Sequence, residues 1–329
     1  MAPSEGMTLA DATPGLVAVV AAASLAPVFG RLGSAVGLVD RGADDLKIHR
    51  APVPILGGLA VVTAAGIGMA VTGRSAPWGL AGAVLVGFVG GLMDDLRPLP
   101  PWVRVLILVL AGMALTTGFD QLPFAAAIGT ALLVLACANA VNIVDGQDGL
   151  AGGLAAIAAL ALGALGAIHG DPAVVAIGVA TTGSLLGFLP WNWPRARLFL
   201  GNGGAYAVGV GLAFLAARLI ALDGWRGLLA AGACLGVFAF EVAFTVARRA
   251  TSGGAITAGD RLHSYDLLAR MRGRVASTLW FWGLGLVAGA VGVSVGVLPL
   301  PVGVALTAGL VVAGTWWGLR LWAGRVPVT

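Results

Sequence analysis

The chain has 329 residues, of which 59% are hydrophobic and 10% are charged, and its mean hydropathy is +0.97. Soluble domains carry about 25% charged residues, so this composition excludes a water-soluble globular protein. The formal net charge of +4 reflects 19 Lys and Arg against 15 Asp and Glu. These basic residues are dispersed over several loops and form no basic stripe, so the charge does not indicate a nucleic-acid partner.

Eleven apolar stretches follow one another along the chain. A helix rises 1.5 Å per residue, so about 20 residues cross the ~30 Å hydrocarbon core of a bilayer. Several stretches are joined by only a few residues, as are antiparallel neighbours in a bundle. The sequence therefore predicts an all-α, polytopic integral membrane protein with about 11 transmembrane helices, at about 13–37, 52–73, 77–93, 101–120, 122–142, 149–169, 171–190, 204–222, 226–248, 276–297 and 300–322.

The Arg and Lys residues predict the orientation of these helices. With the N-terminus outside and the C-terminus in the cytoplasm, only Arg74, Arg218 and Arg226 lie outside, and the other sixteen basic residues lie inside. This bias follows the positive-inside rule. The same threading puts every polar cluster at the cytoplasmic face. We therefore expect one domain, residues 1–329, whose active site is formed by loops near 39–51, 94–101, 139–149, 191–204 and 249–275.

Asp94 and Asp95 are adjacent carboxylates at the predicted end of the third helix. A helix C-terminus carries a partial negative charge, so carboxylates are locally unfavourable there. Paired like charges also raise the pKa of one partner, which suits a general base or a cation site. A solvated helix end is the alternative interpretation, and the pair alone does not separate the two.

Asn139, Asn142, Asp145 and Asp148 are spaced by three residues. If the fifth helix continues one turn past the membrane, they lie along one face of it. Their oxygen atoms are hard ligands of the kind that suits magnesium, which typically keeps several waters and binds substrate phosphates. Packing alone poorly explains four polar groups at the end of an apolar helix, so this pattern favours a functional site.

A glycine-rich turn, Gly201 to Gly204, precedes the predicted eighth helix. Free backbone N–H groups at a helix N-terminus form a ready phosphate site. A turn between two membrane helices also needs no ligand, so this signal is weak by itself.

Four further residues carry basic or imidazole side chains in the cytoplasmic loops. Lys47 and His49 lie in the first loop, and Arg261 and His263 lie in the largest. Taken alone, each is typical of an ordinary positive-inside loop.

Glu241 is expected about two turns inside the ninth helix. An acid within a membrane segment is a functional candidate. A structural ion pair with Arg248 or Arg249 is an equally good interpretation.

At these residues the chain resembles the polyprenyl-phosphate N-acetylhexosamine-1-phosphate transferase superfamily, glycosyltransferase family 4. The resemblance runs in order from about residue 38 to 275. It rests on five motifs: KIHRAPVPILGGLAV, GLMDDLRPL, NAVNIVDGQDGLAGG, LPWNWPRARLFLGNGG and DRLHSYDLLARM.

The resemblance implies a multi-pass enzyme of the bacterial cytoplasmic membrane, with its active site facing the cytoplasm. Members transfer an N-acetylhexosamine 1-phosphate from a UDP-sugar to a polyprenyl phosphate, such as undecaprenyl or decaprenyl phosphate. UMP is released, and the lipid-linked sugar starts cell-envelope polysaccharide synthesis. The implied cofactor is Mg²⁺, and the implied partners are both substrates, membrane lipids and, as often in the family, a second copy of the chain.

The resemblance also implies roles for the residues. Asp94 or Asp95 would deprotonate or orient the lipid phosphate, and Asn142 would be a magnesium ligand. Substrate-binding roles fall to the remaining polar residues: Lys47, His49, Asn139, Asp145, Asp148, Arg261 and His263.

Asn202 departs from the family pattern. The Gly-Asp-x-Gly loop of the family places an Asp on magnesium, and this chain has Asn202 there. Asn keeps an oxygen ligand and loses the negative charge. We therefore expect either a disabled transferase or one with low or altered metal dependence.

Two other classes of protein remain as alternatives. A non-catalytic homologue that binds lipid phosphate or UDP-sugar is compatible with Asn202. A membrane transporter is compatible with the helix number and with Glu241, but transporter sites usually lie at the bilayer midplane on broken helices. The single His263, followed by Ser264 and Tyr265, favours a UDP-N-acetylglucosamine donor or a related N-acetylhexosamine within the family.

Overall fold

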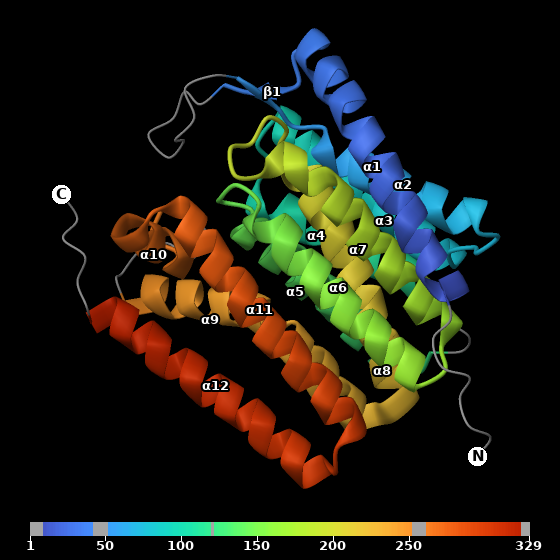
Figure 1. The fold of residues 1–329 in the computed structure, drawn as a ribbon, viewed down its shortest axis with the longest axis vertical. Coiled ribbons are helices and arrows are strands. Elements are labelled where there is room, and N and C mark those ends of the chain that lie inside the picture. Colours follow the sequence, from blue (N-terminus) through green and yellow to red (C-terminus); the bar gives the residue numbers. More distant parts are fainter. Residues whose placement is uncertain (1–8, 42–51, 120–121, 252–260, 324–329) are drawn as a thin grey trace.

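The computed structural model describes residues 9–41, 52–119, 122–251 and 261–323. Helices account for nearly all of the described structure (Figure 1). They are α1 (Leu9–Ala35), α2 (Gly57–Val71), α3 (Trp78–Leu96), α4 (Pro101–Thr116), α5 (Phe124–Val144), α6 (Leu150–Ile168), α7 (Pro172–Asn192), α8 (Gly201–Cys234), α9 (Gly236–Thr251), α10 (Ser264–Arg272), α11 (Arg274–Val297) and α12 (Leu300–Ala323). Two short antiparallel strands, β1 (Val39–Asp40) and β2 (Val53–Pro54), pair between α1 and α2.

The prediction of an all-α, multi-pass membrane protein is confirmed. Among the described residues, eight helices are long and apolar enough to cross a membrane: α1, α3, α5, α6, α7, α8, α11 and α12. The apolar helices α2 and α4 are shorter. Many large hydrophobic side chains are exposed on the outside of the bundle, such as Trp78, Phe124 and Val312. A lipid environment accounts for such exposure, which a soluble domain rarely tolerates.

The expected ninth membrane helix, 226–248, differs from the structure. The backbone leaves helical geometry at Asp223 and Gly224, so the helix that begins at Gly201 bends there before continuing to Cys234. Leu235 separates this part from α9, which runs across the bundle in the view of Figure 1. The apolar run is therefore two helical pieces joined at a bend, because a run of apolar residues predicts length and does not predict direction.

Helix α10 was expected as loop. Its sequence, SYDLLARMR, is only nine residues long and carries three charged side chains. Contacts with α9 and α11 hold it in place, and isolated helices of this length are unstable in water.

Helix α8 lies at the centre of the bundle. It contacts α3, α5, α6 and α11, and most of its residues up to Leu219 are buried. The strand pair, the α5–α6 turn, the α7–α8 loop and α10 gather at one end of the bundle (Figure 1). The start of α1 and the α11–α12 turn lie at the other end. The polar loops thus meet on one side, as the sequence predicts.

Candidate active site

A polar cavity of about 660 Å³ opens among the loops at this end of the bundle. Its walls come from β1, the ends of α3 and α5, the α5–α6 turn, the α7–α8 loop, the start of α8 and the segment before and after α10. The polar side chains that line it are Asp40, Asp95, Asn142, Asp145, Gln147, Asp148, Asn192, Arg195, Asn202, Arg261 and Arg274. Segments more than 200 residues apart in sequence therefore share one site.

The two adjacent carboxylates at the end of α3 point to different places. Asp94 is buried: it lies 3.0 Å from Nε of Arg104 and accepts a hydrogen bond of 2.7 Å from the N–H of Leu99. Asp94 therefore fixes the turn from α3 into α4. Asp95 lines the cavity. Of the pair, only Asp95 can meet a ligand there.

Asp95 also holds the N-terminus of α8. Its carboxylate accepts hydrogen bonds from the N–H groups of Asn202 (3.1 Å) and Gly203 (3.3 Å). The anion thus satisfies free donors and faces the positive end of the helix dipole. Gly201 has φ of +76°, and a Cβ there would lie 3.0 Å from Oδ2 of Asp95. Glycine is required at this position by both conformation and space.

The side chain of Asn202 forms a direct link to Asp94. Its Nδ2 donates a hydrogen bond of 2.9 Å to Oδ2 of Asp94, while the residue also lines the cavity. An amide can donate to a neighbouring carboxylate, whereas an aspartate at the same place would face that carboxylate with like charge. Asn202 therefore joins α3 to α8 by a hydrogen bond between neutral and charged groups.

The end of α5 and the α5–α6 turn bring Asn142, Asp145 and Asp148 to the cavity. The condition for one shared helical face holds only in part: α5 continues past residue 142 to Val144, with Asp145 as its C-cap, and Asp148 lies beyond the helix. Gly149, with φ of +73°, starts α6. Asn142 reaches the cavity from the last turn of α5, and Asp145 and Asp148 reach it from the α5–α6 turn. Asp148 also accepts a hydrogen bond of 3.1 Å from the N–H of Ala196 in the α7–α8 loop.

Acidic groups crowd one part of the cavity wall. Burial raises the pKa of Asp145 well above its usual range, and the nearby charges of Asp95 and Asp148 raise it further. A site that disfavours its own negative charges attracts a cation. Within the described ranges, His, Cys, Asp and Glu side chains form no group of three that could hold a metal ion by themselves. A cation here would therefore need ligands from the substrate or water.

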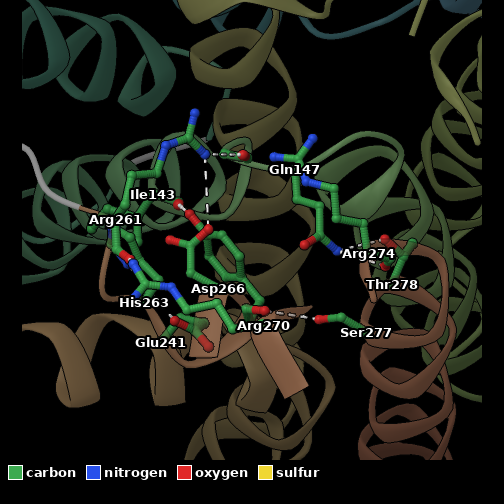
Figure 2. Close-up of polar contacts among 12 residues, drawn as sticks. Ile143, Gln147, Glu241, Arg261, His263, Asp266, Arg270, Arg274, Ser277 and Thr278 are labelled. Atoms are coloured by element: carbon green, nitrogen blue, oxygen red, sulfur yellow. Dashed lines mark hydrogen bonds and ion pairs between the residues drawn. The ribbon is translucent and has the colours of Figure 1, made fainter. Parts of the chain in front are cut away.

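Three arginines also line the cavity. Arg195 comes from the α7–α8 loop, Arg261 precedes α10, and Arg274 begins α11. Nη1 of Arg261 donates to the carbonyl oxygen of Gly146 at 2.8 Å. Figure 2 shows the guanidinium groups of Arg261 and Arg274 extending in the same direction. Arginine suits phosphate because its planar fork donates several hydrogen bonds.

Besides Asp94, the structure places two more of the predicted site residues away from the cavity wall. Nδ2 of Asn139 donates to the carbonyl oxygen of Leu135 on its own helix, at 2.8 Å. His263 is buried, with its Nδ1 3.0 Å from Oγ1 of Thr245. The predicted residues Lys47 and His49 lie outside the described residues.

A layer of contacts behind the cavity ties residues 261–278 to the α5–α6 turn (Figure 2). The hydroxyl of Tyr265 donates to the carbonyl oxygen of Ile143 at 2.8 Å. Nε2 of Gln147 donates to Oγ1 of Thr278 (2.7 Å) and to the carbonyl oxygen of Arg274 (3.1 Å). The acidic turn is therefore braced by the same segment that supplies two of the arginines.

Sequence reasoning singled out neither Asn192 nor Gln147, and it treated Arg195 and Arg274 as general loop charges. Asn192 is buried; it accepts from the N–H of Gly149 and donates to the carbonyl oxygen of Leu198, joining α6 to the α7–α8 loop. The sequence feature that could have indicated Asn192 is an amide side chain at the end of a helix, directly before a Trp-Pro pair. No spacing pattern in the sequence indicated Asp40, which lines the cavity from β1.

The fold and the cavity together define a multi-pass membrane protein with one polar site at the end of its bundle. A family model described as glycosyl transferase family 4 matches residues 77–220. The "Probable undecaprenyl-phosphate N-acetylglucosaminyl 1-phosphate transferase" of Bacillus subtilis is 27% identical over 272 residues, which cover 77% of this chain and 75% of that protein.

Two further relatives are also named as transferases of this kind. The undecaprenyl-phosphate alpha-N-acetylglucosaminyl 1-phosphate transferase of Thermotoga maritima is 27% identical over 257 residues, with 76% of this chain and 80% of that protein covered. A phospho-N-acetylmuramoyl-pentapeptide-transferase of Limosilactobacillus reuteri is 29% identical over 241 residues, with 66% and 73% covered. The chain is therefore similar to glycosyl transferase family 4, by the model over residues 77–220 and by these relatives.

Proposed function

We propose that this protein transfers an N-acetylhexosamine 1-phosphate from a UDP-sugar to a polyprenyl phosphate at the cytoplasmic face of a bacterial inner membrane. An oxygen of the lipid phosphate attacks the phosphorus that carries the sugar. The bond from that phosphorus to the bridging oxygen breaks, and the oxygen leaves with UMP. The product is a polyprenyl-diphosphate-linked sugar for cell-envelope polysaccharide synthesis.

The meeting of acidic side chains and arginines in one cavity is the observation that carries this proposal. Phosphoryl transfer depends mainly on positioning and on neutralising charge. Arg195, Arg261 and Arg274 offer donors to the diphosphate of the nucleotide sugar. The site lies at the end of a membrane bundle, where a lipid phosphate and a water-soluble nucleotide can meet. The names of the relatives support the lipid phosphate and the transferred N-acetylglucosaminyl 1-phosphate.

The residues fit a magnesium ion. Asp145 lies in a buried, acid-rich wall where added positive charge is favourable, and Asn142 and Asp95 line the same cavity. Mg²⁺ binds one or two carboxylates and keeps sites for substrate phosphates, so a complete protein cage is unnecessary. Bound there, the ion would neutralise charge on the diphosphate. Asn142, Asp145 and Asp95 would hold it, and Asn202 would contribute at most a neutral oxygen.

Within the Asp94 and Asp95 pair, Asp95 is the better candidate for the group that orients or deprotonates the lipid phosphate. It lines the cavity, while Asp94 is committed to Leu99, Arg104 and Asn202. Asp94 then acts as a positioning residue that fixes the end of α3. The N–H groups at the start of α8 place Asp95 beside the glycine turn.

The donor sugar we favour is UDP-N-acetylglucosamine or a related N-acetylhexosamine. Two of the relatives are named as N-acetylglucosaminyl 1-phosphate transferases. Others are named as phospho-N-acetylmuramoyl-pentapeptide-transferases, so the donor must be tested directly.

The test is UMP release by the purified protein, supplied with UDP-N-acetylglucosamine and undecaprenyl phosphate, with and without Mg²⁺. The proposal expects release that requires both the lipid phosphate and Mg²⁺. Absence of release with this donor and with UDP-N-acetylmuramoyl-pentapeptide would contradict it. Asp95→Asn serves as the inactive control, since it keeps the size of the side chain.

Binding and transport measurements separate the alternatives. Saturable binding of UDP-N-acetylglucosamine without turnover would favour a non-catalytic homologue. Movement of unchanged labelled substrate into liposomes would favour a transporter. The geometry supports the transferase over the transporter because the described helix break at Asp223 and Gly224 lies outside the polar cavity.

A further inference from the structure

Glu241 is a buried acid that the proposed reaction does not use. It lies on α9, is fully buried and does not line the cavity. The ion pair with Arg248 or Arg249 that the sequence suggested is replaced by contacts to the start of α10. An ionised carboxylate this deep is costly unless hydrogen bonds satisfy it, so its partners are informative.

The partners of Glu241 are the first groups of α10. The hydroxyl of Ser264 donates to Oε1 of Glu241, and the backbone N–H of Ser264 lies near the same carboxylate. His263, the N-cap of α10, offers no capping bond from its own side chain. Its Nδ1 lies 3.9 Å from Oε2 of Glu241 and 3.0 Å from Oγ1 of Thr245, also on α9. An acid from one helix thus caps the N-terminus of another.

A second acid completes this cap from within α10. Asp266 lies near the backbone N–H of His263, and its Oδ1 lies 3.8 Å from Nη1 of Arg261. An acid that reaches back to the N-cap in this way stabilises the first turn of a helix. Nη2 of Arg270 donates to the carbonyl oxygen of Arg261 at 2.9 Å, so the backbone of Arg261 is held from α10 as well.

From this cap, two routes lead to the cavity (Figure 2). Arg261 passes from Asp266 to the carbonyl oxygen of Gly146 and lines the cavity. The ring of Tyr265 is stacked on His263, with centroids 5.1 Å apart and planes 2° from parallel. Its hydroxyl donates to the carbonyl oxygen of Ile143, next to Asn142. The first route ends on the α5–α6 turn at Gly146, and the second ends on the last turn of α5 at Ile143.

We propose that Glu241 is a positioning residue: by holding the start of α10, it sets the place of Arg261 and of the α5–α6 turn in the active site. The role of His263 is then to pack between Glu241 and Tyr265, where the sequence had suggested a contact with the diphosphate. This inference rests on the proposed function for its activity readout, and its structural readout is independent of it.

The first experiment compares hydrogen exchange of the backbone amides of residues 143–150 in the full-length protein. Glu241→Leu removes the cap, and Ser264→Ala removes one donor more gently. The amides of the turn are expected to exchange about tenfold faster in Glu241→Leu, and less so in Ser264→Ala, because local opening becomes easier. Glu241→Gln keeps acceptor oxygen for Ser264 and is expected to remain near the wild type.

Asp171 supplies the matched control. It is a buried acid that caps the N-terminus of α7 and binds Arg218, at the opposite end of the bundle from the cavity. Asp171→Leu removes a comparable cap. It is expected to lower the melting temperature while leaving the exchange of residues 143–150 unchanged.

The second experiment measures kcat and KM for UDP-N-acetylglucosamine. Glu241→Leu is expected to lower kcat/KM by about ten- to hundredfold, since small displacements of positioned groups have effects of this size. In an Arg261→Gln background the same change is expected to have a smaller effect, because both act partly through one contact.

The inference would be overturned if the amides of the turn exchange at the wild-type rate in both Glu241→Leu and Ser264→Ala. It would also be overturned if the fold-losses in kcat/KM of Glu241→Leu and Arg261→Gln simply multiply in the double variant. If exchange rises as expected while the wild-type protein shows no turnover, the positioning role stands and the proposed function fails.

Discussion

At the scale of single residues, Asn202 has the clearest consequence. Its amide donates to Asp94, so Asn202→Asp would set two carboxylates at hydrogen-bond distance. We expect that variant to lose about 2 kcal/mol of stability without divalent cations, since a hydrogen bond to a charged group is replaced by like-charge repulsion. Mg²⁺ is expected to restore the stability and to bind more tightly than in the wild type. Melting temperatures at increasing Mg²⁺ concentration measure both effects.

The reciprocal variant controls for this change. Asn202→Asp combined with Asp94→Asn exchanges the amide and the acid and restores a hydrogen bond. It is expected to recover stability without Mg²⁺. If Asn202→Asp alone gains neither activity nor magnesium affinity, then position 202 does not limit the enzyme.

Asp145 gives the protein a pH-dependent stability. Burial, with Asp95 and Asp148 nearby, raises its pKa in the folded state above the ordinary value of about 3.9. The folded state therefore binds the proton more tightly than the unfolded state. The resulting stabilisation is full below the unfolded pKa and is lost as pH rises through the folded pKa.

Asp145→Asn should remove this dependence. In EDTA, the variant is expected to melt at a higher temperature than the wild type near neutral pH, and the difference should shrink as pH falls toward 4. It is also expected to lose turnover, because Asp145 faces the proposed cation and substrate. If the difference in melting temperature between Asp145→Asn and the wild type is the same at all pH values, the assignment is contradicted.

The two arginines that sequence reasoning passed over should bind the nucleotide sugar. Arg195→Gln and Arg274→Gln are each expected to raise KM for UDP-N-acetylglucosamine about tenfold, the effect of losing roughly 1.4 kcal/mol of binding. Arg197→Gln is the control, because Arg197 lies over the ring of Trp191 and donates to the carbonyl oxygen of Pro190. Equal KM values for all three variants would show that the basic wall does not bind the donor.

At the scale of elements, the start of α8 depends on a glycine. Gly201→Ala would place a Cβ 2.7 Å from the carbonyl oxygen of Ile55 and 3.0 Å from Oδ2 of Asp95 at a positive φ, whereas Gly37→Ala has a φ of the same size with open space around it. We expect Gly37→Ala to lose about 1 kcal/mol from backbone strain alone. Gly201→Ala should lose more and should also abolish turnover. Similar losses of stability, with activity kept in both, would mean that crowding at Asp95 is unimportant.

The elements also show where prediction from the sequence succeeds and where it stops. Apolar length and positive φ at Gly149 and Gly201 are local properties, so most helices and the polar turns were predicted. The bend at Leu235 and the helix α10 depend on distant partners: Glu241 caps α10 from another helix. The side chains of Asp94 and Asp95 point in different directions because Asp94 pairs with Arg104 while Asp95 binds the start of α8. The spacing of residues along the sequence does not reveal these partners.

At the scale of the whole molecule, the proposed function requires that the active site faces the cytoplasm. The cavity and the end of α9 lie toward one end of the bundle, and the turn between α2 and α3 lies toward the other (Figure 1). Thr251 is the last residue of α9, and Ser75 belongs to the α2–α3 turn. In sealed right-side-out vesicles, Ser75→Cys should react with a membrane-impermeant maleimide. Thr251→Cys should react only after permeabilisation. The native Cys137 and Cys234 are buried and are replaced by Ala as a background. The reverse pattern would put the active site outside.

The most direct measurement of the central claim follows the phosphorus atom itself. The purified protein is given undecaprenyl phosphate and UDP-N-acetylglucosamine labelled with ³²P in the phosphate next to the sugar. Transfer of a sugar 1-phosphate predicts that the label moves into the lipid product and that UMP is released unlabelled in equal amount. Label that leaves as UDP, or that stays entirely in the nucleotide sugar, would contradict the account.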